Sequence, residues 1–160
     1  MFSSVVRNSV SLFAGIVLLA GCGGKPSASD ARKIVAAKVQ SQTQGLIKLS
    51  AFENTDSSVI YHPMTGEKLC DVMQYTYEIT FAKDCMWNKA SNGMFSAAPF
   101  DAEWKEDLGS MTEAEIKAIE REIEPLYNFS NIGIKGKTIQ FKEGTMRVIK
   151  TKKGWVEDED

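Results

Sequence analysis

An unbroken alternation of apolar and polar side chains over residues 74–81 constrains the fold of this chain more than any other feature. The apolar positions are Tyr75, Tyr77, Ile79 and Phe81, and the polar positions are Gln74, Thr76, Glu78 and Thr80. A period of two predicts a β-strand with one buried and one wet face, and we expect it to span residues 73–83. Such a strand needs neighbours and a covering layer, which predicts an antiparallel sheet with a helix packed on it.

Shorter alternating runs predict the other strands of this sheet. We expect them over residues 46–52, 59–61, 138–141 and 145–151, with Trp155 and Val156 starting a last strand. Polar, glycine and proline residues predict the turns between them. These turns are expected at residues 54–58, 62–67, Glu143–Gly144 and 152–154.

Two segments have helical periodicity. Ala31, Val35 and Val39 recur every fourth residue, which predicts a helix that starts at Ser29 or Asp30 and stops at Gly45. Its N-cap is expected to be Ser27 with Asp30, or Ser29 itself. The second helix is expected over residues 112–124. It has two overlapping capping boxes, one apolar stripe and a proline that predicts its end. The boxes are Ser110 with Glu113 and Thr112 with Glu115, the stripe is Ile116, Ile119, Ile123 and Leu126, and the proline is Pro125.

These elements predict an α+β fold in which the N-terminal helix packs on a curved antiparallel sheet. The 160 residues suit one domain, which we place at residues 29–156. Residues 22–28 are rich in glycine and serine and are expected to be a flexible tether. Residues 157–160 are all acidic and are expected to form a solvated, frayed tail.

The N-terminus has the pattern of an export signal. Arg7 precedes an apolar run over residues 12–20, which is too short to be a comfortable membrane span, and the run ends in Leu19-Ala20-Gly21-Cys22. This resembles the signal of bacterial lipoproteins, which implies that residues 1–21 are removed and that Cys22 is lipidated. In lipoproteins of this kind, an aspartate directly after the lipidated cysteine resembles a signal for retention at the inner membrane. This chain has Gly23 at that position, so the resemblance implies that the protein is anchored in the outer membrane and faces the periplasm.

The two other cysteines are Cys70 and Cys85. In an oxidising compartment pairing is the default, so we expect a disulfide between them that closes a loop of about 15 residues. A free thiol pair or a metal site is the alternative, but no CxxC motif accompanies them. His62 is the single histidine of the chain, so we expect no metal and no cofactor.

Catalytic groups are scarce. His62 lies in a loop context and no nucleophile or phosphate-binding motif accompanies it, which predicts that the protein is not an enzyme. A carboxylate–tyrosine pair is the remaining option, built from Glu78 or Asp84 with Tyr75 or Tyr77. Strand parity places Glu78 on the face opposite both tyrosines. The net charge of −2 gives no indication of a nucleic-acid partner.

Four aromatic residues are candidates for a partner-binding surface. They are Trp87, Phe95, Phe100 and Trp104, which lie between small and polar residues. Aromatic side chains are enriched in recognition surfaces, but they also fill cores. Both interpretations, core and binding surface, remain open from the sequence.

Several short stretches together resemble small secreted or lipid-anchored bacterial domains of the cystatin-like or NTF2-like group. They are residues 29–33, residues 46–49 with Phe52, residues 77–81 before Asp84-Cys85, and residues 150–155. The resemblance covers residues 28–156. It implies a sheet curled around an N-terminal helix and supplies no catalytic residues, and the helix at 112–124 departs from the plainest form of that fold.

These features predict a lipid-anchored envelope protein with a non-enzymatic domain that binds a ligand or a protein. Its partners would be the membrane, through the N-terminal lipid, and an envelope protein. Two alternatives remain. One is an inhibitor or immunity lipoprotein against a hydrolase or toxin, with the loop between Cys70 and Cys85 as a rigid wedge. The other is a structural component of an envelope complex.

Overall fold

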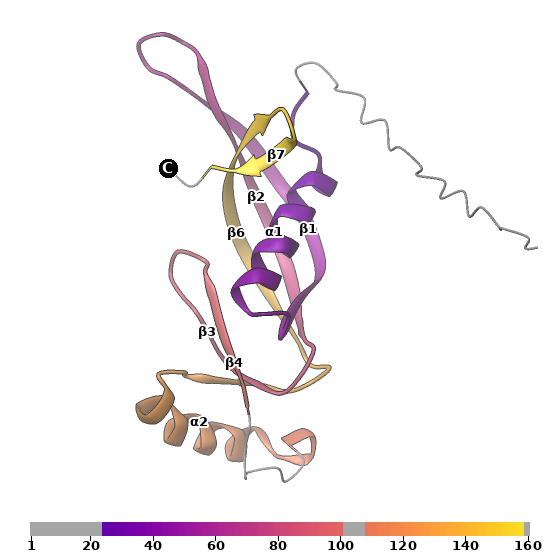
Figure 1. Ribbon diagram of the computed structural model, residues 1–160, viewed down its shortest axis with the longest axis vertical. Coiled ribbons are helices and arrows are strands. Elements are labelled where there is room, and N and C mark those ends of the chain that lie inside the picture. The colour runs from indigo at the N-terminus through magenta and orange to yellow at the C-terminus, as the bar shows by residue number, and fades with distance from the viewer. Residues whose placement is uncertain (1–23, 101–107, 159–160) are drawn as a thin grey trace, which may run out of the picture.

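The computed structural model describes residues 24–100 and 108–158, which form an α+β fold as the sequence predicts (Figure 1). The two α-helices are α1 (Ala28–Gln42) and α2 (Glu113–Tyr127), and a 3₁₀ turn, η1, covers Leu108–Ser110. The strands are β1 (Ile47–Tyr61), β2 (Lys68–Phe81), β3 (Cys85–Lys89), β4 (Phe95–Pro99), β5 (Asn131–Gly133), β6 (Thr138–Thr151) and β7 (Gly154–Glu157).

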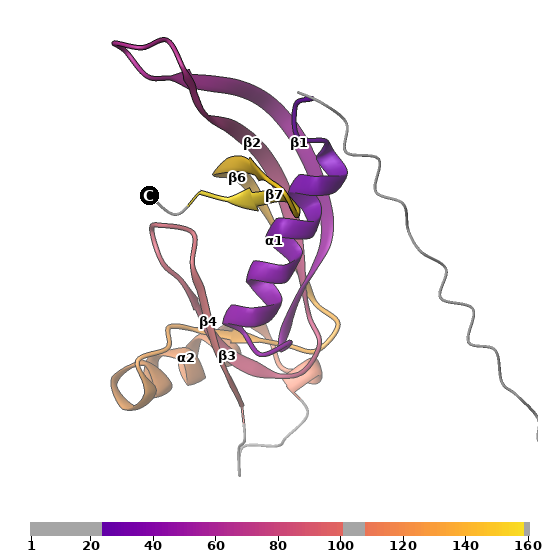
Figure 2. The same ribbon diagram turned by 45° about the horizontal axis from the view of Figure 1, so that its top comes forward.

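The larger sheet has four antiparallel strands in the order β1-β2-β6-β7, and it bends around α1 (Figures 1 and 2). The predicted helix-on-sheet layer is therefore confirmed. The apolar parity of β2 faces the helix, since Tyr77, Ile79 and Phe81 are buried in the main core. Ala31, Val35 and Val39 of α1 are buried in the same core. The apolar face of the helix and the apolar face of β2, both predicted from sequence periodicity, therefore pack against each other.

Helix α1 begins at Ala28, one or two residues before the periodicity predicts, and its cap is the expected pair Ser27 and Asp30. Ser27 is the N-cap: its hydroxyl accepts a hydrogen bond from the Asp30 backbone N–H, and the Asp30 carboxylate accepts one from the Ser27 N–H. This capping box places Ala28 inside the helix, and Pro26 is buried. The predicted tether over residues 22–28 is thus wrong for its second half. Cys22, its lipidation and the signal at residues 1–21 lie outside the described residues.

The turn predicted at residues 54–58 is wrong, because β1 continues through these polar residues to Tyr61. The register between β1 and β2 shifts after Leu49 and again after Asn54, and the two strands remain paired on both sides of each shift. Polar residues are tolerated there because residues 55–58 are exposed and need no apolar face. The real turn is the predicted one at residues 62–67, which closes a long hairpin (Figure 2).

The turn predicted at Glu143–Gly144 is also wrong, because β6 runs unbroken from Thr138 to Thr151. Gly144 pairs with Tyr75 across the sheet, and an added Cβ there would lie 2.4 Å from the Tyr75 ring carbon Cε2. The glycine therefore makes room for an aromatic ring and does not form a turn. The predicted turn at residues 152–154 is present between β6 and β7.

The smaller sheet, ordered β4-β3-β5, packs against α2 through a second apolar cluster. Thr112 and Glu115 form the capping box that starts this helix. The helix continues past the predicted end at Glu124 to Tyr127, with Pro125 inside its last turn. Ile119 and Ile123 are buried as predicted, but Leu126 is 72% exposed because no element of the described chain covers the last turn.

The predicted disulfide is wrong: Cys70 and Cys85 are both free and buried. Cys70 pairs with Ile60 in the larger sheet, whereas Cys85 pairs with Pro99 and Gly133 in the smaller one. The chain from Cys70 to Phe81 is a single strand, about 35 Å long at the usual rise per residue. Bonded cysteines need Cα atoms within about 7 Å. The segment between the cysteines is therefore mainly strand β2 and not a loop closed by a disulfide.

No helix in residues 24–100 and 108–158 is both long enough and apolar enough to span a membrane.

Candidate functional site: a pocket between the first helix and the curved sheet

A cavity of about 310 Å³ lies between α1, the adjoining parts of β2 and β6, the β3–β4 loop and the end of β7. Its walls come from α1, β2, β3, β4, β6, β7 and the β3–β4 loop. The cavity exists because the sheet bends around the helix and the β3–β4 hairpin leans over the C-terminal half of that helix (Figures 1 and 2).

The floor of the cavity is formed by the aromatic residues Tyr75, Tyr77 and Phe95, and Phe141 packs against them in the core without lining the cavity. The rings of Tyr77 and Phe141 stack with centroids 4.8 Å apart, and Phe95 meets both of them edge-on. Burial raises the pKa of Tyr75 to about 12 and raises the pKa of Tyr77 further, so both phenols are neutral at physiological pH. The floor therefore offers apolar ring faces and phenolic hydroxyl groups.

Lys89 brings a positive charge into this aromatic environment. Its Nζ lies 4.2 Å from the Phe141 ring centroid and 5.3 Å from that of Tyr77, which are cation–π distances. Burial lowers the pKa of this amine, which marks partial removal from water. No carboxylate of the described residues forms an ion pair with it. The positive charge of Lys89 is thus available to an anion in the cavity.

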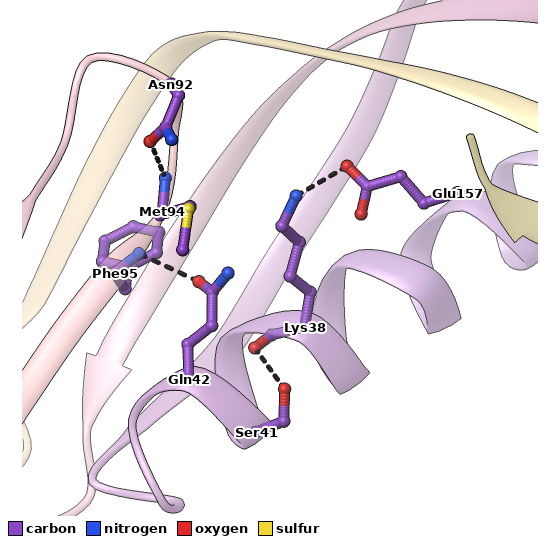
Figure 3. Close-up of polar contacts among 7 residues, drawn as sticks. All are labelled: Lys38, Ser41, Gln42, Asn92, Met94, Phe95 and Glu157. Carbon is purple, nitrogen blue, oxygen red and sulfur yellow. Dashed lines mark hydrogen bonds and ion pairs between the residues drawn. The ribbon is translucent and has the colours of Figure 1, made fainter. Parts of the chain in front are cut away.

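A second lysine at the cavity is already paired. Lys38 Nζ lies 2.6 Å from Glu157 Oε1, and both side chains are mostly buried (Figure 3). Glu157 is the last residue of β7, and Asp158 follows it in an ion pair with Arg147 at 2.9 Å. The predicted frayed tail is therefore wrong for its first two residues, because fixed cations hold them. Glu159 and Asp160 lie outside the described residues.

Polar contacts hold the β3–β4 loop over the helix. Gln42 Oε1 accepts a hydrogen bond from the Phe95 backbone N–H at 2.9 Å, and Asn92 Oδ1 accepts one from the Met94 N–H at 3.1 Å (Figure 3). Gly93 has a φ of +81°, a left-handed conformation that glycine adopts without strain. One side chain of α1 thus fixes the start of β4, and with it the edge of the cavity.

The aromatic residues predicted as a partner-binding surface belong mainly to the core. Trp87 is 7% exposed and Phe95 is 5% exposed, and both pack in the main cluster. Phe100 is half-buried against the second cluster, and Trp104 lies outside the described residues. The core interpretation is therefore confirmed for Trp87 and Phe95, while Phe100 keeps part of its ring in water. Phe95 alone also lines the cavity.

The predicted acid–base candidates lie away from the cavity. Glu78 accepts a hydrogen bond from the Ser50 hydroxyl at 2.9 Å, and Asp84 Oδ1 accepts one from the Lys135 N–H at 2.8 Å. Neither lines the cavity, whereas Tyr75 and Tyr77 do, as strand parity predicts. His62 Nδ1 accepts backbone N–H groups of Met64 and Thr65 within the hairpin turn. The described residues contain no group of three or more metal-ligating side chains.

Sequence reasoning missed Lys38, Gln42 and Lys89. Lys38 and Gln42 flank Val39 on the buried side of α1, so the helical period alone could have found them. No sequence signal identifies Lys89, because its position depends on how the smaller sheet leans on the larger one. In comparisons with known proteins, no family model, curated protein or solved structure matches this chain.

Proposed function

We propose that this chain is a lipid-anchored protein of the bacterial cell envelope whose domain binds a small ligand without catalysing a reaction. The location depends on Leu19-Ala20-Gly21-Cys22, the pattern that resembles a lipoprotein signal. Lipidated Cys22 would hold the domain at the outer membrane, facing the periplasm. The binding role depends on the cavity between α1 and the curved sheet.

The observation that carries the binding role is the position of the Lys89 ammonium over the aromatic floor, without a carboxylate partner in the described chain. A ligand with one anionic group and a small apolar body complements both features. Its anion would pair with Lys89, and its apolar part would lie on Tyr77 and Phe95. About 310 Å³ is near the lower end of ligand pockets, which favours a small molecule.

The other charged groups favour binding over catalysis. The carboxylate of Glu157 is occupied by Lys38, and the two tyrosines at the floor hold their protons at physiological pH. Glu143 is exposed where it borders the cavity, and no histidine lines it. A general base needs a desolvated carboxylate or imidazole beside the reacting group, and neither is in place.

Binding can be tested with two probes of equal chain length and opposite charge, octanoate and octylammonium. Titrations followed by amide NMR shifts should show octanoate binding at least tenfold more tightly, with shifts at Phe95, Gln42 and Lys89. Lys89→Met should remove this preference. Lys48→Met, an exposed lysine on β1 outside the cavity, is the matched control and should keep it. Equal affinities for both probes, or no effect of Lys89→Met, would contradict the proposed ligand class.

The anchor has its own test. The mass of the mature protein isolated from membranes should match a chain that starts at an acylated Cys22. A chain that keeps Met1 and carries no fatty acid would contradict the envelope location.

A further inference from the structure

The tip of the β1–β2 hairpin exposes a group of large apolar side chains. They are Ile60 at 39%, Tyr61 at 58%, Met64 at 91% and Leu69 at 47% of full exposure. The hairpin extends beyond the rest of the described chain, so no other element covers this tip (Figures 1 and 2). Clustered apolar groups in water mark a contact surface.

These side chains lie on both faces of the hairpin. Ile60 and Tyr61 are successive residues of β1, so their side chains point to opposite faces. The extra residue at this point is on β2, because Ile60 pairs with Cys70 and Tyr61 pairs with Lys68, which leaves Leu69 unpaired. A protein packed on one face would leave the other in water. The head-group region of a bilayer surrounds an inserted tip from all sides.

Basic side chains surround the base of the tip. Lys68 and Lys150 each place Nζ within 6 Å of the Trp155 ring centroid, at 5.6 and 5.8 Å. Lys152 and Lys153 are exposed in the turn between β6 and β7, and Arg32 and Lys33 are exposed in the first turns of α1. Tyrosine and tryptophan beside lysine and arginine are typical of membrane–water interfaces.

The N-terminal end of the described chain lies at the same place. Gly24 borders a surface hollow together with Lys68, Leu69 and Trp155. In the sequence, Cys22 precedes Gly24 by only two residues. Because Pro26 is buried and Ser27 caps α1, little chain remains to move the domain away from a lipid on Cys22.

We infer that the hairpin tip is a second membrane contact beside the lipid anchor. Met64 and Tyr61 enter the head-group region of the phospholipid bilayer. The exposed Lys152 and Lys153 face the lipid phosphates, whereas Lys68 is paired with Asp71 at 2.6 Å. The inference depends on the proposed lipidation of Cys22. Two contacts fix the orientation of the domain, whereas a lipid on a tether would leave it free to rotate. The cavity beside Lys38 and Gln42 then faces away from the bilayer, because these residues lie at the opposite end of α1.

The test uses the full chain, isolated in acylated form and reconstituted in vesicles of phosphatidylethanolamine and phosphatidylglycerol at 3:1. Met64→Cys carries a nitroxide label, since Cys70 and Cys85 are buried and Cys22 is acylated. Leu126→Cys is the matched control, because it replaces an exposed apolar residue on α2 at the far end of the molecule. The label is then exposed to oxygen, which concentrates in lipid, and to a nickel complex that dissolves only in water. The ratio of the two collision rates tells whether the label lies in lipid or in water. A third protein adds Tyr61→Asp to Met64→Cys.

The label at residue 64 should collide several-fold more often with oxygen than with the nickel complex. The label at residue 126 should collide mainly with the nickel complex. Tyr61→Asp should shift the label at residue 64 toward water. If acylated protein floats with the vesicles while both labels remain in water, the second contact is wrong and the anchor stands. If mass measurement finds no acyl chain, the anchor fails and the second contact fails with it.

Discussion

Lys38 on α1 and Glu157 at the end of β7 are 119 positions apart in the chain, yet their Nζ and Oε1 atoms lie 2.6 Å apart. This ion pair joins the first helix of the domain to its last strand at the wall of the candidate cavity. It also explains why an acidic C-terminal sequence forms a strand end: a fixed, partly buried ammonium pairs with its first carboxylate.

Breaking this pair should cost about 1 kcal/mol of unfolding free energy, a value reduced because both groups keep some contact with water. A double-mutant cycle of Lys38→Met and Glu157→Gln, measured by urea unfolding, gives the coupling directly. The control is the exposed pair Lys117–Glu113 on α2, which should show a much smaller coupling. Additive effects of Lys38→Met and Glu157→Gln would contradict a stabilising contact.

Gly144→Ala should destabilise the fold by about 1–3 kcal/mol, because its Cβ would lie 2.4 Å from the Tyr75 ring in a packed sheet. The ring would have to move, so near-ultraviolet circular dichroism of the tyrosines should change as well. Gly24→Ala is the control: no atom lies within 4 Å of its added Cβ, and its unfolding midpoint should equal that of the parent protein. A stable Gly144→Ala variant would mean that the ring has room.

Two free thiols are expected from Cys70 and Cys85. Denaturing the protein without reductant in the presence of iodoacetamide should add two carbamidomethyl groups to the domain, because neither cysteine is bonded to another cysteine. The native protein should react slowly, since both side chains are buried. If the denatured protein is alkylated only after reduction, Cys70 and Cys85 form a disulfide, and the conclusion that strand β2 holds them far apart is wrong.

Unfolding free energy should fall between about pH 9 and pH 11. Burial, followed by the nearby Asp84 charge, raises the pKa of Cys85 to about 11 from the ordinary value of 9.0. The unfolded chain therefore loses this proton first, so the contribution of the thiol is complete below pH 9 and lost as pH rises through 11. A rise in pKa of this size corresponds to roughly 2–3 kcal/mol of unfolding free energy.

The check is urea unfolding with reductant at pH 8, 9, 10 and 11. Cys85→Ala should make the free energy of unfolding depend less on pH over this interval. The dependence that remains above pH 10 comes from Tyr75 and Tyr77, whose pKa values are raised by burial. Identical slopes for the parent and Cys85→Ala proteins would show that the thiol does not titrate in this way.

Ile123→Ala should destabilise the protein by about 2–4 kcal/mol, because Ile123 is 2% exposed in the cluster between α2 and the smaller sheet. Leu126→Ala, three residues later on the same helix, should change stability by less than about 0.5 kcal/mol, since Leu126 is 72% exposed. Thermal unfolding of both variants measures the difference. Similar losses for both would mean that α2 packs through a different face.

Local periodicity determined the main elements from the sequence alone. The alternation over residues 74–81 predicted β2 and its buried parity, and the fourfold spacing of Ala31, Val35 and Val39 predicted α1 and the face that it buries. The capping boxes predicted where both helices start to within a few residues. Each of these signals depends on neighbours within about four positions, so no knowledge of the rest of the chain is needed.

Only the tertiary structure decided what lies together across long distances in the chain. Pairing with β2 carries β1 through polar residues 54–58, and the Tyr75 ring explains Gly144 without a turn. The length of β2 separates Cys70 from Cys85, and the lean of the smaller sheet buries Trp87 and brings Lys89 over Phe141. Such contacts join residues tens of positions apart, and local propensity carries no information about which distant partner will fill a given space.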